Sequence, residues 1–227
     1  MLTIVLCRNK IYVMLILGIE TSCDETGVAL VEDGRRIMVN LVASQVEIHR
    51  PFGGVVPEMA SRAHLETLPP LLDRALADSG IGLDEIGAVA FTRGPGLIGS
   101  LLVGTSFAKG IAFARKLPLV GVNHLKAHLY APVLEGAEYE FPLVGMVVSG
   151  GHTLLVLARS FDEVRLLGST RDDAAGEAFD KVACLLELGY PGGPVIEESA
   201  RTGDPERFDL PRGMIQSGDY DFSFSGV

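Results

Sequence analysis

Short apolar runs alternate with polar or glycine-rich segments along most of the chain, and two of these alternations share one layout. Residues 14–20 (MLILGIE) and 27–34 (GVALVEDG) are apolar runs on either side of the polar segment TSCDET. This pattern predicts a β-hairpin with a polar tip. A second hairpin is predicted from residue 143, where PLVGMVVSGGHTLLVLARSF places a Ser-Gly-Gly turn between two apolar runs. The shared layout indicates an internal duplication.

The segment between the two hairpins reads as strands followed by helices. Alternation over residues 39–48 predicts a strand, and a Gly/Pro loop then leads into a helix. One face of that helix carries, at helical spacing, Leu65, Leu68, Leu72 and Leu76. Pro69 and Pro70 are expected to interrupt and kink the helix. Further strands at 88–92 and 118–123, each followed by a helix, suit a mixed sheet with helices packed on it.

A polar segment at residues 136–142 (GAEYEFP) is the expected boundary between two lobes. We expect an upstream extension at 1–13, an N-terminal lobe at 14–136 and a partial C-terminal lobe at 137–227. In the second lobe, DDAAGEAFDKVACLLELG predicts a helix with acids at its start. Its predicted buried stripe is Ala178, Val182, Leu185 and Leu186. Another helix is predicted after YPGGP, with Pro194 in its first turn, and the abrupt end at FSFSGV suggests a truncated chain.

Composition narrows the function classes. A formal net charge of −10 leaves the chain as a whole without the basic footprint of a nucleic-acid-binding domain, so an RNA substrate would need a local patch or a partner protein. Cys7, Cys23 and Cys184 form no CxxC motif, which favours the reducing cytosol. No segment reaches the roughly 18–20 apolar residues of a membrane span. We therefore expect a cytoplasmic protein without membrane contact.

Two histidines four residues apart, His124 and His128 in NHLKAH, give the sharpest chemical signal. Spacing i, i+4 puts both imidazoles on one helix face, a common arrangement for binding zinc or a transition metal. The alternative is a pair of surface histidines on an amphipathic helix. A zinc protease of the H-E-x-x-H type is disfavoured, because Leu125 stands where that motif has its general base.

The two hairpin tips are weaker signals for a phosphate or nucleotide. Asp24 and Glu25 lie at the first tip, which could face a phosphate with a cation or water, although an ordinary polar turn explains them too. At the second tip, Ser149, Gly150 and Gly151 would let backbone amides approach a phosphate or acyl group. Two such tips in duplicated positions carry more weight than either alone, because they could clasp one ligand.

Three further patterns have plain structural alternatives. Glu177 and Asp180 share an accessible helix face, which is also typical of a solvated surface. Gly192 and Gly193 precede a helix and could present amides to an anion, or simply form its entry turn. The loop RGPGLIGSLLVG lacks the GK[ST] of a P-loop and the spacing of GxGxxG. Its glycines are interpreted as close helix–sheet packing, and they could also let a ligand approach the backbone.

Taken in order, these motifs resemble the signature segments of the TsaD family across residues 14–227. The matching segments are GIETSCDET (18–26), GGVVPEMASRAH (53–64), GPGLIGSLLVG (94–104), NHLKAH (123–128), VSGGHT (148–153), DDAAGEAFDK (172–181), YPGGP (190–194) and DFSFSG (221–226). This family is the bacterial counterpart of the archaeal and eukaryotic KEOPS catalytic subunit. The resemblance implies an α/β fold of the actin/hexokinase/Hsp70-like (ASKHA) type, with two lobes, duplicated β-hairpins and an incomplete second lobe.

The activity that this resemblance implies is that of a tRNA N6-adenosine threonylcarbamoyltransferase, which makes the t6A modification. Threonylcarbamoyl-AMP is the donor, N6 of adenosine 37 in tRNAs that read ANN codons is the acceptor, and AMP leaves. Partner proteins of the TsaB and TsaE type are implied as well. The resemblance also implies one iron(II) per subunit, bound by His124 and His128, that orients the donor and polarises its carbonyl.

The remaining site residues are carried over from the family by position. The donor would be lined by residues 147–151, which are Val147, Val148, Ser149, Gly150 and Gly151. Asp180 would hold the ribose hydroxyls, and Gly193 and Glu197 would complete that pocket. Asp24 and Glu25 would lie by the phosphates as catalytic residues.

The chain departs from the family in two places. Lys126 stands where relatives usually have an acid, which changes the charge near the metal. The segment after FSFSG, expected to bring an Asn for the nucleotide and an Asp as third protein ligand, is absent, so we expect this chain alone to be poorly stable or inactive. Two rivals remain: an ASKHA-type sugar kinase, which has no reason to carry the histidine pair, and a non-catalytic paralogue, which is expected to lack it.

Overall fold

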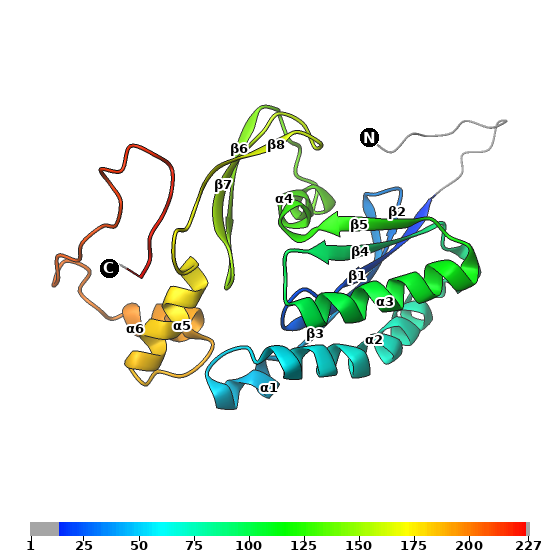
Figure 1. Ribbon diagram of the computed structural model, residues 1–227, viewed down its shortest axis with the longest axis horizontal. Helices are drawn as coiled ribbons and strands as arrows, with labels where there is room; N and C mark the ends of the chain where they lie inside the picture. Colours follow the sequence, from blue (N-terminus) through cyan, green and yellow to red (C-terminus); the bar gives the residue numbers. More distant parts are fainter. Residues whose placement is uncertain (1–13, 226–227) are drawn as a thin grey trace. The chain divides into compact units, whose positions relative to one another are not determined.

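The computed structural model describes residues 14–225 of the 227-residue chain, so the predicted extension at 1–13 lies outside the described residues (Figure 1). The described chain divides into two compact units. The first comprises residues 14–51 and 55–137, and the second comprises residues 52–54 and 138–225. Each unit has its own sheet, and each is described by itself.

The first unit is built on a five-stranded sheet with the order β3-β2-β1-β4-β5. Its strands are β1 (Leu15–Glu20), β2 (Glu25–Glu32), β3 (Arg36–Ser44), β4 (Ala88–Gly94) and β5 (Leu119–Asn123). The first three strands form an antiparallel meander, whereas β1, β4 and β5 run parallel. The predicted mixed sheet is confirmed, and the carboxyl ends of its three parallel strands share one edge.

The first predicted hairpin is confirmed, with Leu15 opposite Glu32 and Glu20 opposite Gly27. The next connection is tight because Asp33 and Gly34 both have positive φ, 52° and 67°, which suits a short β-turn. The strand predicted at 39–48 is displaced: this turn lets pairing start at Arg36, and pairing ends at Ser44. Residues 46–48 belong instead to the short helix α1 (Val46–His49).

Helices α2 (Pro57–Ser79), α3 (Ile98–Arg115) and α4 (His124–Leu134) pack against the strands of this sheet. The chain also forms two single-turn 3-10 helices, η1 (Arg50–Phe52) and η2 (Leu83–Glu85). Figure 1 shows α2 and α3 side by side along the sheet. Alternate residues of the central strands, such as Leu17, Val28 and Val89, pack in one core with Leu68 of α2 and Ala108 of α3. Burial of this apolar surface is the main force that holds the unit together.

Helix α2 differs from the prediction in two ways. It is one continuous helix through Pro69 and Pro70, so the predicted interruption is wrong. A proline removes a hydrogen bond to the carbonyl four residues earlier. Here those carbonyls belong to the exposed Leu65 and Glu66, where water can satisfy them. The predicted face is wrong at Leu65, which is 64% exposed, and the buried stripe runs through Ala60, His64, Leu68, Leu72 and Ala75.

The second unit repeats the antiparallel meander of the first. Its strands β6 (Leu143–Val148), β7 (Thr153–Ala158) and β8 (Val164–Ser169) pair in the order β6-β7-β8. The second predicted hairpin is confirmed, with Val148 opposite Thr153 beside the tip. The helices α5 (Ala175–Leu185) and α6 (Gly192–Ala200) follow, with Pro194 in the first turn of α6 as predicted. The repeated meander agrees with the ASKHA-type α/β fold.

The predicted buried stripe of α5 is wrong. Val182, Leu185 and Leu186 are 45%, 82% and 60% exposed, and Ala183 is the fully buried residue of the helix. The periodic pattern correctly marks an apolar face, but no described element covers that face. Among residues 14–225, no helix is both long and apolar enough to cross a membrane.

Candidate functional site

The shared carboxyl edge of β1, β4 and β5 carries the main cluster of polar side chains in the first unit. Ligand sites in open α/β sheets commonly lie at this edge. Helix α4 starts directly where β5 ends (Figure 1). Asn123 caps the helix, because its side-chain oxygen accepts a hydrogen bond from the backbone N–H of Lys126 at 3.1 Å. The cap fixes where the first turn of α4, and with it His124, projects from the sheet.

The two histidines of α4 converge as their spacing predicts. Nε2 of His128 lies 3.1 Å from Nε2 of His124, and the ring centroids are 4.5 Å apart at an interplanar angle of 81°. Two imidazoles that bind one ion at about 2.1 Å place their nitrogens roughly 3.0–3.4 Å apart, for right-angle to tetrahedral geometry. The observed separation therefore fits a shared metal ion.

Glu20, the last residue of β1, contacts the side of the His124 ring that faces away from His128. Its Oε2 lies 3.3 Å from Nδ1 of His124, and Ser22 Oγ lies 3.2 Å from the same nitrogen. The backbone N–H of Ser22 and the hydroxyl of Thr92 donate to the Glu20 carboxylate. Burial tends to raise the pKa of Glu20, but the hydrogen bonds from His124, Ser22 and Thr92 outweigh it and lower the pKa to about 2. The carboxylate is thus ionised.

Sequence reasoning missed Glu20. An acid that ends an otherwise apolar strand was the available signal, since such a side chain is costly at that position unless it has partners. Glu20 contacts Nδ1 of His124, on the opposite side of the ring from the nitrogen that faces His128. Within residues 14–225, no group of three or more His, Cys, Asp or Glu side chains is placed to hold a metal ion.

The TSCDET turn places the two predicted catalytic acids in different settings. Asp24 is half-buried, and its carbonyl accepts a hydrogen bond from the N–H of Gln45 at 2.9 Å. Glu25 is exposed at the start of β2. Desolvation, together with the charge of Asp24, raises the pKa of the neighbouring Cys23 thiol to about 12, which disfavours its thiolate form. The catalytic roles of Asp24 and Glu25 stay predictions.

A buried histidine network anchors this turn to α2 and α1. His64 is fully buried; its Nε2 lies 2.9 Å from the carbonyl of Cys23 and its Nδ1 lies 2.8 Å from the hydroxyl of Thr26. The carbonyl can only accept, so Nε2 carries the hydrogen and Nδ1 accepts from Thr26. Gln45 links the network to α1, because its Nε2 lies 3.3 Å from Nδ1 of His64 and its Oε1 accepts from Nε2 of the buried His49 at 3.1 Å. A neutral His64 satisfies all of these contacts.

Mild acid is expected to destabilise the first unit through His64. Burial lowers the pKa of His64, more than the carbonyl of Cys23 raises it. In the unfolded chain His64 is protonated near pH 6.5, whereas in the folded chain it is protonated only at lower pH. The free energy of unfolding therefore falls as the pH drops below about 6.5. His64→Gln should flatten this dependence in urea unfolding followed by circular dichroism at pH 7.5 and 5.5.

His128 provides the control for this experiment, because burial lowers its pKa as well. The His128→Gln variant should keep the contribution of His64 to the pH dependence of stability and lose only the contribution of His128. Equal slopes of unfolding free energy against pH for the wild type and the His64→Gln variant would contradict the assignment.

In the second unit, the turn between β6 and β7 packs against the start of α5. The N–H of Gly176 donates to the carbonyl of Ser149 at 3.2 Å. A Cβ atom on Gly176 would lie 2.7 Å from Cα of Gly150 and 2.8 Å from the Ser149 carbonyl oxygen, whereas one on Gly150 or Gly151 would meet nothing within 4 Å. The β6–β7 turn therefore packs tightly against α5 at Gly176, whereas the space next to Gly150 and Gly151 is open.

The other residues assigned to the donor lie around this turn and in the α5–α6 pair. Val147 is buried, whereas Val148 is 56% exposed. Asp180 accepts a hydrogen bond from the N–H of Gly192 at 2.7 Å, which ties α5 to the first residue of α6. Gly193 is half-buried and Glu197 is exposed on α6. The structure thus brings Asp180 beside Gly192, at the start of α6.

Glu177 and Asp180, which were expected to share a helix face, have different partners. The Glu177 carboxylate lies 3.0 Å from Nζ of Lys181, one helical turn further along. Asp180 instead accepts from the N–H of Gly192. Glu177 therefore belongs to the solvated face of α5, and Asp180 to its junction with α6.

Asp172, which precedes α5, forms hydrogen bonds with residues 223–225 in addition to lying near the positive end of the helix dipole. Asp172 accepts hydrogen bonds from Ser223 Oγ and from the N–H groups of Phe224 and Ser225. The hydrogen bond from Ser223 is the largest of the effects that lower the pKa of Asp172 to about 2. The DFSFSG segment is thereby fastened to the loop between β8 and α5.

The close contacts of α3 confirm the interpretation of the RGPGLIGSLLVG glycines as packing residues. A Cβ atom on Gly96 would lie 2.5 Å from the carbonyl oxygen of Ser22, and one on Gly104 would collide with the hydroxyl of Thr21. Thr21 is fully buried and donates to the carbonyl of Ser100 at 2.9 Å. These glycines let α3 lie directly against the TSCDET turn.

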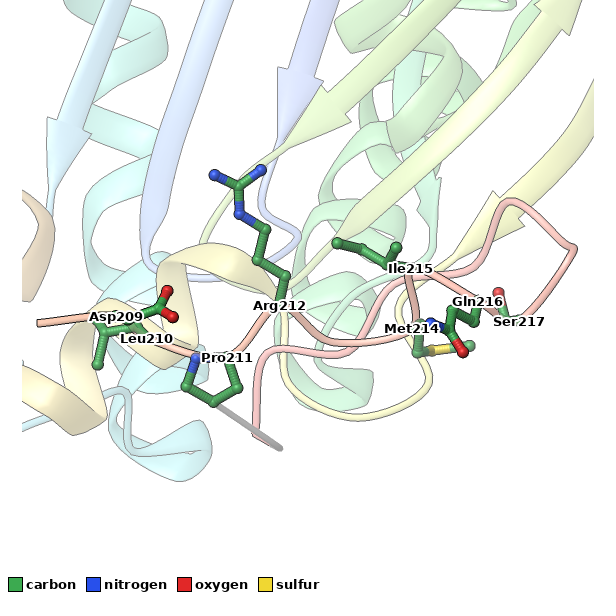
Figure 2. A pocket seen from close by; sticks show the side chains of 8 residues that line it. All are labelled: Asp209, Leu210, Pro211, Arg212, Met214, Ile215, Gln216 and Ser217. Carbon is green, nitrogen blue, oxygen red and sulfur yellow. The ribbon is translucent and has the colours of Figure 1, made fainter.

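A hollow in the last part of the chain is no candidate for the site. Figure 2 shows it to be lined by a single coil segment, within residues 209–217, and its volume is about 610 Å³. None of the lining side chains is buried. A ligand pocket normally converges buried polar groups from several elements, whereas this hollow is the inside of an exposed loop.

Comparison with known proteins identifies extensive similarity to one family. The family model described as TsaD, tRNA N6-adenosine threonylcarbamoyltransferase, matches residues 36–227. The tRNA N6-adenosine threonylcarbamoyltransferase of Caldicellulosiruptor saccharolyticus is 54% identical over 94% of this chain and 63% of its own length. That of Symbiobacterium thermophilum is 58% identical over 94% of this chain and 62% of its own length. The chain spans less than two thirds of these relatives.

Among solved structures, YeaZ from Pseudomonas aeruginosa is 25% identical, with a TM-score of 0.45 over 67% of this chain and 64% of that chain.

Proposed function

Since the chain belongs to the TsaD family of tRNA N6-adenosine threonylcarbamoyltransferases, we propose that it transfers the threonylcarbamoyl group from threonylcarbamoyl-AMP to N6 of adenosine 37 in tRNAs that read ANN codons. The observation that supports this most is the convergence of the His124 and His128 Nε2 atoms, 3.1 Å apart, at the carboxyl edge of the sheet. A sugar kinase of the same fold has no use for this pair. Free thiols at Cys23 and Cys184 accord with a cytoplasmic location.

His124 and His128 would hold iron(II), through the two nitrogens whose separation fits one ion. When bound, the ion supplies a Lewis-acid charge that polarises the donor's carbonyl, which makes it more reactive toward the weakly nucleophilic N6 amine. Lys126 places a positive charge on the same helix. A third protein ligand, an Asp, is proposed in the part of the relatives' length that this chain does not span.

The second unit would bind the donor nucleotide. Residues 147–151 would line it, with the open space around Gly150 and Gly151 leaving their backbone amides accessible to a phosphate or acyl group. Asp180 would hold the ribose hydroxyls beside Gly193 and Glu197, since its second carboxylate oxygen makes no hydrogen bond within residues 14–225. Asp24 and Glu25 are proposed on the phosphate side.

The acidic character of the chain implies help in binding tRNA. With a formal net charge of −10, the chain repels the phosphate backbone at long range. Partner proteins of the TsaB and TsaE type are proposed to provide the complementary surface.

The test supplies the complete gene product with both partner proteins, threonylcarbamoyl-AMP and an ANN-decoding tRNA, and measures t6A in the digested tRNA by mass spectrometry. Formation of t6A is expected. ATP-dependent phosphorylation of a sugar without t6A would support the kinase instead. If omitting this protein lowers the yield of neither product, the result would support a non-catalytic paralogue.

A further inference from the structure

We propose that Glu20 is a positioning residue that fixes His124 with its hydrogen on Nδ1, and so leaves the metal-binding lone pair on Nε2. The inference deepens the proposed function and rests on its metal site. Glu20, Thr92 and His124 come from β1, β4 and α4, and they meet because the three parallel strands end at one edge. No motif in the sequence places them together.

The hydrogen-bond chemistry of the carboxylate decides the tautomer. An ionised carboxylate can only accept hydrogen bonds, so a neutral imidazole that faces Glu20 Oε2 at 3.3 Å must carry its hydrogen on Nδ1. The hydroxyl of Ser22, 3.2 Å from the same nitrogen, can rotate to accept as well. The lone pair of His124 then resides on Nε2, the nitrogen that faces His128.

Glu20 is itself held in place on both oxygens. The backbone N–H of Ser22 donates to Oε1, and the hydroxyl of Thr92 donates to Oε2. Ser22 and Thr92 are buried, at 3% and 7% exposure. The carboxylate therefore cannot turn away from His124 without leaving buried donors unpaired, which is costly.

The contact between the histidines agrees with this assignment. Because Nε2 of His124 accepts, the 3.1 Å contact requires Nε2 of His128 to carry the donated hydrogen. A metal ion bound by both nitrogens would take the place of that hydrogen, and His128 would then carry its hydrogen on Nδ1. Ligating histidines generally donate their other N–H to a carboxylate or carbonyl, which fixes the ring and raises the basicity of the ligating nitrogen.

The substitution Glu20→Gln separates positioning from simple anchoring. Its amide oxygen can still accept from Ser22, which preserves the turn, while its NH₂ group would face His124 and favour a hydrogen-free Nδ1. The His124 hydrogen would then move to Nε2 and block the metal-binding lone pair. If the role of Glu20 is purely structural, the substitution should change the stability of the protein and leave the tautomer of His124 unchanged.

The test measures two quantities on the full chain, and Glu32→Gln serves as the matched control because Glu32 pairs with Arg36 at the far end of β2. Nitrogen-15 NMR of the metal-free protein should find the His124 hydrogen on Nδ1 in the wild type and in the control, and on Nε2 in the Glu20→Gln variant. Titration with cobalt(II) should show binding about 10–100-fold weaker in that variant alone.

The outcomes distinguish this inference from the proposed function. A His124 hydrogen on Nε2 in the wild type overturns the inference without any variant, as does a tautomer that Glu20→Gln leaves unchanged. If the tautomer reverses as expected but the wild type binds no metal, the role of Glu20 in orienting His124 stands and the metal site of the proposed function fails.

Discussion

Replacing His124 by Ala is expected to abolish stoichiometric iron(II) binding. The wild type should bind one ion per subunit, whereas the variant keeps only His128 of the pair whose Nε2 atoms converge. Loss of a residue that hydrogen-bonds to a ligating histidine costs roughly 10–100-fold in metal affinity, and loss of the ligating histidine itself should cost more. Iron retained after anaerobic loading and desalting, determined by plasma mass spectrometry, provides the measurement.

Asp73→Ala is the control for this substitution, because Asp73 is an exposed side chain on α2, in the same unit as His124. The control should retain the iron content of the wild type. Thermal unfolding of both variants must be checked, since an unfolded protein would lose iron for a trivial reason. Unchanged iron in a folded His124→Ala protein refutes the assignment of His124 as a ligand.

Replacing Gly176 by Ala is expected to lower the stability of the second unit and to weaken binding of the donor nucleotide. The added Cβ would lie 2.7 Å from Cα of Gly150 and 2.8 Å from the carbonyl oxygen of Ser149. Both are backbone atoms, so the turn must shift as a whole rather than rotate a side chain. Overpacking of this kind costs about 1–3 kcal/mol, measurable by urea unfolding, and titration with AMP reports the effect on binding.

The matched control is Gly150→Ala in the same turn. A Cβ on Gly150 meets no other atom within 4 Å, so its effect on the free energy of unfolding should be small. If Gly176→Ala and Gly150→Ala unfold at the same urea concentration, the turn is not held against α5 as the structure indicates. Loss of AMP binding in the Gly150→Ala variant alone would instead place the nucleotide directly on that residue.

Features of the fold that depend on neighbours in sequence could be predicted. Both hairpins, the two strands that precede α3 and α4, and the helix that carries His124 follow from local hydrophobic periodicity and turn residues. The pairing of the two histidines follows from the 3.6-residue period of a helix. Such features are fixed by residues a few positions apart.

Features that depend on contacts between residues distant in sequence could not be predicted. Glu20 meets His124 across 104 positions, and His64 meets the carbonyl of Cys23 across 41. The stripe predicted on α5 was wrong for a related reason: periodicity identifies an apolar face, but what covers the face is set by other elements. Leu185 accordingly has the right spacing and is 82% exposed.

The continuity of α2 has a different physical origin. A helix interior with two prolines is disfavoured by local propensity. Leu68 and Leu72, on either side of the proline pair, are buried against the sheet, so tertiary packing holds the helix together where propensity alone would end it.

The t6A content of an ANN-decoding tRNA tests the central claim most directly. The tRNA is incubated with threonylcarbamoyl-AMP, the two partner proteins and either the wild-type gene product or its His124→Ala variant. Metal-assisted acyl transfer at the histidine pair predicts t6A with the wild type and little or none with the variant. Equal t6A from both proteins, or none from a folded, iron-loaded wild type, would contradict it.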